Sequence, residues 1–163
     1  MELNNLKLIG SEEWCAFNQL KIPAILARVD SGARTSSIQA SEIKLIKKNN
    51  EDWVSFAVYP LQKNNSLKVS CSAKLVDKRS IKGSFGISEE RLIITTPLTI
   101  GEDSFDIELS LANRNTMEFR MLLGREAMSN RFVINPGTRQ VQQKYLKKEA
   151  VSLYKLIVNN DSD

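Results

Sequence analysis

Short apolar or alternating segments, separated by turn residues, constrain this chain more than any other feature. The clearest segment, residues 105–111, alternates strictly between apolar and polar side chains, as a half-buried β-strand does. Further strands are predicted over residues 22–29 and 53–59, and residues 92–96 and 98–100 form either a strand pair or one strand broken by Pro97. Residues 121–123 and 132–134 are short apolar runs. Turn residues occur at Asn49-Asn50, Asn64-Asn65, Gly101-Glu102 and Pro136-Gly137. This spacing predicts a mainly β protein, built as a small closed or sandwiched β domain.

Helix is predicted in only two places. Residues 125–130 can form one turn after Gly124. Near the end of the chain, Leu146, Ala150, Leu153 and Ile157 follow the spacing of an amphipathic helix. We therefore expect one β domain over residues 1–143 and a C-terminal extension over residues 144–163, helical and then frayed.

The size and composition are those of an ordinary soluble domain. A chain of 163 residues buries roughly 68–70% of its unfolded surface, so a core forms without disulfides. No apolar run approaches the ~18 residues of a membrane span, and the first ten residues do not resemble a signal peptide. The only two cysteines lie far apart, which favours a reducing, cytoplasmic location.

The chain contains no histidine, which removes many catalytic and metal-binding mechanisms. Ser-His-Asp and Cys-His catalysis are excluded, and so are zinc sites that depend on imidazole. With two cysteines, only oxygen ligands remain for a metal, and these suit zinc poorly. We therefore expect no cofactor, and acid–base chemistry by Asp, Glu, Lys, Tyr or Cys.

The segment Asp30-Ser31-Gly32 follows the apolar run 22–29 and is the strongest candidate for chemistry. Gly32 lets backbone amides approach the Asp30 carboxylate, and Ser31 offers a hydroxyl to fix the loop. A carboxylate held in this way suits a group that activates water. The alternative is a simple turn, because Asp, Ser and Gly are common turn residues.

A second segment, Met121-Leu122-Leu123-Gly124-Arg125, lies far downstream. Read by itself, it is a strand that ends at a glycine. Together, Asp-Ser-Gly-Ala and Leu-Leu-Gly-Arg resemble the two landmarks of retropepsin-like aspartic peptidases. This resemblance implies a small closed β-barrel of the acid-protease type, in which the apolar-apolar-Gly strand packs beside the catalytic Asp loop.

The chain is most similar to a family labelled ATP-dependent zinc proteases. That family typically has A-K-V-D-T-G-A-R-T-S, where this chain has ARVDSGARTS. The similarity continues in residues 53–56, 79–91, 109–124 and 125–136, and covers about residues 8–140. Three positions depart from the family pattern: Ser31 stands where the family usually has Thr, Gln39 where it often has His, and Asn135 where it often has Asp. Without histidine no family His can bind zinc, and no G-x-x-x-x-G-K phosphate loop is present.

The resemblance implies peptide hydrolysis by Asp30, with Ser31 and Gly32 completing the catalytic loop. That chemistry uses two carboxylates sharing a proton, one as the base toward water and one as the acid toward the carbonyl. The chain has one Asp-Ser-Gly, so the second carboxylate is expected from another copy in a homodimer.

Several arginines inside the family motifs are candidates for binding an acidic substrate, because arginine pairs well with carboxylates. These candidates are Arg34, Arg79, Arg91, Arg114 and Arg125. The same residues could instead brace the fold. Family members are associated with ATP-grasp glutamate ligases, which by analogy suggests such a ligase as a partner and oligoglutamate as a substrate.

Two other readings stay open. The basic cluster Lys74, Lys78, Arg79 and Lys82 is interpreted first as a solvated loop, and of its members only Arg79 is also a candidate for substrate binding. A non-catalytic binding module on the same fold, holding an acidic protein or nucleic acid, is the alternative function. A net charge of +4 and the lack of a basic helix give nucleic acid little support.

Overall fold

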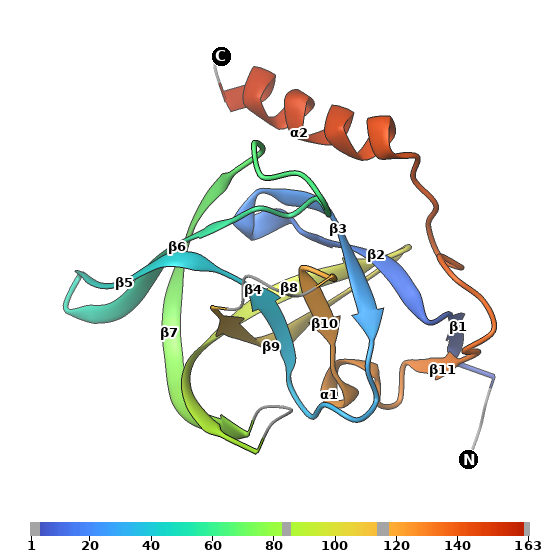
Figure 1. Ribbon diagram of the computed structural model, residues 1–163, viewed down its shortest axis with the longest axis horizontal. Coiled ribbons are helices and arrows are strands. Elements are labelled where there is room, and N and C mark those ends of the chain that lie inside the picture. Colours follow the sequence, from blue (N-terminus) through green and yellow to red (C-terminus); the bar gives the residue numbers. More distant parts are fainter. Residues whose placement is uncertain (1–3, 83–85, 114–117, 162–163) are drawn as a thin grey trace.

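The computed structural model describes residues 4–82, 86–113 and 118–161. Figure 1 shows a β domain with one long helix lying across one end. Its elements are β1 (Lys7–Ile9), β2 (Glu12–Phe17), a 3-10 turn (Asn18–Leu20), β3 (Ile22–Val29), β4 (Ser36–Gln39), β5 (Ser41–Lys48), β6 (Glu51–Val58), β7 (Val69–Lys82), β8 (Ser88–Ile100), β9 (Asp103–Ala112), β10 (Met121–Leu123), α1 (Arg125–Met128), β11 (Phe132–Ile134) and α2 (Lys147–Asp161).

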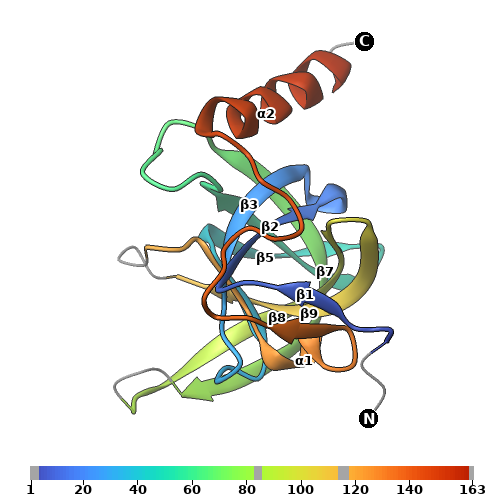
Figure 2. The same cartoon turned by 90° about the vertical axis from the view of Figure 1, so that its right-hand side faces the viewer.

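Six strands close into a barrel, in the order β2-β3-β10-β4-β9-β8. The ring closes where Ala16 of β2 pairs with Thr99 of β8. The sheet then continues outward from β8 through β7 and β6 to β5, and β1 and β11 form a separate parallel pair (Figures 1 and 2). The predicted mainly β, closed-barrel fold is confirmed.

The alternating residues of these strands fill the barrel. Ile25, Ile38, Leu109 and Met121, from four adjacent strands, are fully buried. Each such side chain contributes about 1.5–3 kcal/mol by leaving water. On β9, Asp106 and Glu108 are less buried than Ile107 and Leu109, which produces the alternation that the sequence shows.

The predicted strands are present, and the strand at residues 22–29 has the predicted bounds. The short apolar runs at residues 121–123 and 132–134 are also strands. Of the two alternatives for residues 92–100, the single strand is correct, because β8 continues through Pro97. At Pro97, β8 is no longer paired with β7, because that pairing ends at Ile94. The missing N–H of proline therefore removes no hydrogen bond to β7.

Several strands were not predicted, among them β5 and β7. Their residues are largely exposed, so the apolar alternation is weak. The basic cluster at residues 74–82 therefore lies on β7, and its interpretation as a loop was wrong. Its ion pairs are with Asp77 of the same strand and with Glu51 of β6 and Glu108 of β9, and the local sequence does not reveal the latter two.

Both predicted helices are present. The apolar face of α2 differs from the prediction at two positions: Leu146 is 62% exposed, and Tyr154, which was not predicted, is buried as Ala150 is. Leu146 directly precedes α2, and its backbone N–H donates to the Glu149 carboxylate at 2.9 Å. The Tyr154 hydroxyl donates to the backbone oxygen of Ala24 and fixes α2 to β3.

A buried carboxylate anchors the segment that leads to α2. Glu13 of β2 is fully buried and accepts hydrogen bonds from the backbone amides of Gly10, Val141 and Gln142 at 2.7–2.9 Å. These three donors satisfy the buried carboxylate.

Within the described residues, no helix is both long and apolar enough to span a membrane.

Candidate active site

The loop containing Asp30 begins where β3 ends beside β10. These strands run parallel, with Val29 opposite Leu123. The backbone N–H of Asp30 donates to the carbonyl oxygen of Leu123 at 2.9 Å, so Asp30 leaves the barrel at a fixed point. The predicted packing of the Leu-Leu-Gly strand beside the Asp loop is therefore present.

Gly124 lets the two segments approach each other. A Cβ atom at this position would lie 2.6 Å from the Thr35 carbonyl carbon and 2.8 Å from the Ser36 nitrogen. The Gly124 N–H donates to Ser36 Oγ at 2.9 Å, and the Arg125 N–H donates to the Ala33 oxygen at 2.7 Å. These bonds close both ends of the loop on β10 and α1.

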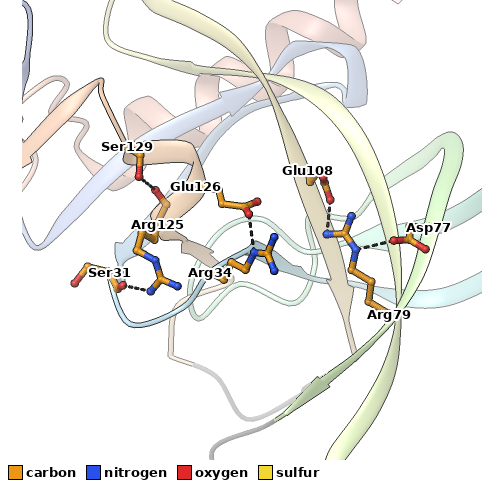
Figure 3. Close-up of polar contacts among 8 residues, drawn as sticks. All are labelled: Ser31, Arg34, Asp77, Arg79, Glu108, Arg125, Glu126 and Ser129. Atoms are coloured by element: carbon orange, nitrogen blue, oxygen red, sulfur yellow. Dashed lines mark hydrogen bonds and ion pairs between the residues drawn. The ribbon is translucent and has the colours of Figure 1, made fainter.

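Within the loop, the Asp30 carboxylate is half-buried, and its Oδ1 accepts a hydrogen bond from the Gly32 N–H at 3.0 Å. In the part of the chain that the structure describes, no ion pair involves Asp30. The Ser31 hydroxyl makes no hydrogen bond with the described residues. Ser31 instead accepts, at its carbonyl oxygen, a 2.9 Å hydrogen bond from Arg125 Nη1 (Figure 3).

Asp30 opens into a pocket of about 650 Å³ between its own loop and the β7–β8 hairpin. Small side chains from β4 and β9, Ser37 and Ser110, line the pocket between these two sides. The complete lining is Asp30, Gly32, Ala33, Arg34, Thr35, Ser37, Arg79, Ser80, Ile81, Lys82, Arg91, Ser110, Ala112 and Leu122. The fold thus brings the Asp loop together with four basic residues.

Arg79 lies between two carboxylates. Its Nε donates to Asp77 Oδ2 at 2.7 Å, and its Nη1 pairs with Glu108 of β9 (Figure 3). These bonds, to Glu108 first and to Asp77 second, raise the pKa of Arg79, and the bond to Arg79 lowers the pKa of Asp77. Arg79 therefore braces β7 against β9 as well as lining the pocket.

The other pocket cations differ in exposure. Arg91 is only 6% exposed, with Nη1 3.4 Å from Ser110 Oγ and Nη2 3.5 Å from Glu89. The Arg34 side chain is 76% exposed and pairs with Glu126 of α1 at 2.7 Å. Lys82 is also exposed. Arg34 and Lys82 are thus the accessible cations at the pocket.

Two predicted arginines lie elsewhere. Arg125 contacts the back of the Asp loop through Ser31 and is not part of the pocket lining. Arg114 lies outside the described residues. Lys82 was not predicted as a site residue, because its position on the hairpin opposite Asp30 depends on how β7 pairs with β8.

The residues present do not fit a zinc ion. The chain has no histidine, and the described residues contain no group of three Cys, Asp or Glu side chains that could hold a metal. Gln39 and Asn135, which stand where the family often has His and Asp, do not line the Asp30 pocket. Gln39 lines a different pocket, and the Asn135 side chain accepts a hydrogen bond from the Gly137 N–H.

Several curated proteins resemble this chain over most of its length. It is 47% identical to a probable alpha-L-glutamate ligase of Shewanella pealeana, over 90% of this chain and 34% of that protein. It is 55% identical to a probable alpha-L-glutamate ligase of Desulfotalea psychrophila, over 80% of this chain and 28% of that protein. The chain therefore spans about a third of the length of these relatives.

A solved structure and a family model cover the barrel. A Legionella pneumophila protein of unknown function superposes with a TM-score of 0.70 at 21% identity, over 84% of this chain and 98% of that protein, which shows a shared fold. The family model described as retropepsin-like aspartic endopeptidase RimB matches residues 8–145. This match includes both the Asp30 loop and the Leu-Leu-Gly strand, and the chain belongs to the RimB-like family of retropepsin-like aspartic endopeptidases.

Proposed function

We propose that the protein is an aspartic peptidase, active as a homodimer, that cleaves acidic peptides. One observation carries the proposal: Asp30 lies at a pocket, held by the Gly32 amide and paired with no cation among the described residues. A carboxylate that only braces the fold uses its oxygens in structural contacts, as Asp77 does with Arg79 and Glu13 does with three backbone amides. Asp30 is instead available to water and substrate.

The reaction needs two carboxylates and one water molecule. The ionised carboxylate removes a proton from water, and the water oxygen attacks the peptide carbonyl carbon. The protonated carboxyl group gives its proton to the carbonyl oxygen at the same time. The tetrahedral diol then loses a proton from oxygen as the C–N bond breaks, and the nitrogen receives a proton. The products are a carboxylic acid and an amine.

The second carboxylate comes from a second copy of the chain. The sequence has one Asp-Ser-Gly, and among the described residues Asp30 is the only acidic side chain that lines the pocket. A two-fold dimer with facing Asp30 loops supplies the pair, because an isologous interface brings the same residue from both copies to the axis. Ser31 and Gly32, both exposed at the loop tip, would lie next to that axis.

The acidic substrate is supported by charge and by the relatives. Arg34 and Lys82 are exposed at the pocket, and Arg79 and Arg91 line it deeper. The curated relatives are named as probable alpha-L-glutamate ligases. A glutamate-rich peptide made by such a ligase has the charge that these cations attract, so the ligase is the proposed partner and its product the proposed substrate.

The test is the Asp30→Asn variant, assayed on hexaglutamate. Turnover should fall by about a hundred- to ten-thousandfold, because general acid–base catalysis by the carboxylate is lost. The melting temperature should change little, since Asn keeps the size and the acceptor for the Gly32 amide. Excess Asp30→Asn chains should also inhibit the wild type by forming mixed dimers. Undiminished turnover in the variant refutes the aspartic mechanism; a dead variant that does not inhibit refutes the dimer.

A second candidate is a non-catalytic module that holds an acidic chain. The names of the relatives favour it, because a ligase that extends a glutamate chain needs a site to hold that chain. Tight binding of hexaglutamate by the wild type, with no cleavage over days and a monomeric state, would support the module over the peptidase.

A further inference from the structure

A second pocket, of about 390 Å³, lies at the end of β4 away from the Asp30 loop. Its lining includes Gln39 of β4, Arg120 just before β10, and Tyr59 and Asn65 from the segment after β6. No part of the catalytic proposal uses these residues. The sequence singled out Gln39 only as a departure from the family pattern.

Strand pairing relates this pocket to the first one. Ser37 pairs with Leu122, and the Gln39 N–H donates to the Arg120 oxygen at 2.8 Å, so Gln39 lies opposite Arg120. Residues two apart on a strand face the same side. Gln39 therefore shares a face with Ser37, and Arg120 shares it with Leu122. Because Ser37 and Leu122 line the Asp30 pocket, the two pockets occupy one face of β4 and β10.

The polar groups of this second pocket are incompletely matched. Arg120 is half-buried, and its Nη2 donates to Asn65 Oδ1 at 3.1 Å, but no carboxylate among the described residues pairs with it. Gln39 Oε1 is buried and has no hydrogen-bond donor among those residues. Buried polar groups are normally satisfied, and a guanidinium prefers a carboxylate.

We propose that Arg120 and Gln39 form a distal subsite that binds a carboxylate of an acidic peptide. Arg120 pairs with the carboxylate, and Gln39 accepts a hydrogen bond from a neighbouring peptide N–H. A peptide is the ligand class that offers both groups side by side. The inference rests on the proposed function, since it assigns to the same cleft a second point of substrate contact.

The separation of the two sites sets which carboxylate is bound. The β3–β10 register places Asp30 level with Gly124, and Arg120 lies four positions before Gly124, directly before β10. Four strand residues span about 13 Å. An extended peptide covers that distance in about four residues. The bound group is therefore a glutamate side chain, or the terminal carboxylate, about four residues from the bond at Asp30.

The experiment measures binding of fluorescein-labelled hexaglutamate in the Asp30→Asn background, where no cleavage complicates the titration. Arg120→Met should raise Kd about tenfold, the effect of losing one charge-assisted hydrogen bond. The Kd of Arg120→Lys should lie between that of the Asp30→Asn parent and that of Arg120→Met. Arg139→Met removes the same charge from an exposed position that lines neither pocket, and should leave Kd within about twofold.

A peptide series identifies the carboxylate. Six hexapeptides each carry one glutamine in place of glutamate, and a seventh carries an amidated C-terminus. The penalty of Arg120→Met should vanish for one peptide of the series: a glutamine peptide if the side chain is bound, the amidated peptide if the terminus is bound.

If Arg120→Met raised the Kd of every peptide by the same factor, Arg120 would act only by general charge attraction, and the subsite proposal would be wrong. An unchanged Kd in Arg120→Met, or no binding of hexaglutamate at all, overturns it too. None of these results depends on turnover, so the peptidase proposal stands or falls separately.

Discussion

The backbone amide of Asp30 donates a 2.9 Å hydrogen bond to the carbonyl oxygen of Leu123, which joins two segments far apart in the sequence. This bond fixes where the Asp loop leaves the barrel. Arg125, two residues after Leu123, then holds the loop from behind through the Ser31 oxygen. The Leu-Leu-Gly-Arg segment is thus the support on which the orientation of the Asp30 carboxylate depends.

Arg125→Met should lower kcat about tenfold with little change in KM. The side chain holds Ser31 and does not line the pocket, so its loss loosens the catalytic loop without removing a substrate contact. Steady-state kinetics on hexaglutamate provide the measurement, with Arg139→Met as the charge-matched control. A rise in KM alone would return Arg125 to the substrate-binding role that the sequence suggested.

Gly124→Ala should lower the free energy of unfolding by about 1–3 kcal/mol, because the new methyl group overlaps backbone atoms of Thr35 and Ser36. Urea unfolding measures the change. Gly137→Ala is the matched control, since its nearest contact would be the Asn135 side-chain oxygen at 3.3 Å. Equal stability of the two variants would show that the loop and β10 can separate without cost.

Both cysteines should resist a thiol reagent in the native protein at about pH 8. Burial raises the pKa of Cys71 to about 12, and burial together with the Glu13 charge raises the pKa of Cys15 well above its usual range. A raised pKa keeps the thiol protonated below that value, and the thiolate is the reactive form. Labelling should become rapid in guanidinium chloride. Native labelling at the rate of free cysteine would contradict the burial of both side chains.

Binding of acidic peptides should weaken as salt rises. Arg34 and Lys82 are exposed, and attraction between exposed charges is screened beyond about 10 Å at 0.1 M salt. Hexaglutamate should bind more tightly than hexalysine, and its Kd should increase steadily between about 0.05 and 0.3 M sodium chloride. Equal affinity for the two peptides would remove the acidic substrate while leaving the peptidase proposal intact.

The sequence by itself determined the fold class and the two segments that meet at the site. The alternation at residues 105–111 and the apolar run 22–29 reflect burial on one or both faces of a strand. Burial determines whether each position carries an apolar or a polar side chain, so it can be read from the sequence. Asp30 and Gly124 were recognisable because their neighbours have a distinctive order. Exposed strands such as β5 carried no comparable signal.

Tertiary structure alone decided what surrounds Asp30. Arg79 and Lys82 belong to a strand that the sequence presented as a basic loop, and Arg79 pairs with Glu108 only because β7 and β9 approach the same pocket. Gln39 and Arg120 become neighbours only through the pairing of β4 with β10. Such contacts depend on the order and register of the strands in the barrel. Hydrogen bonds between segments far apart in the sequence fix that order and register, so no local sequence pattern predicts them.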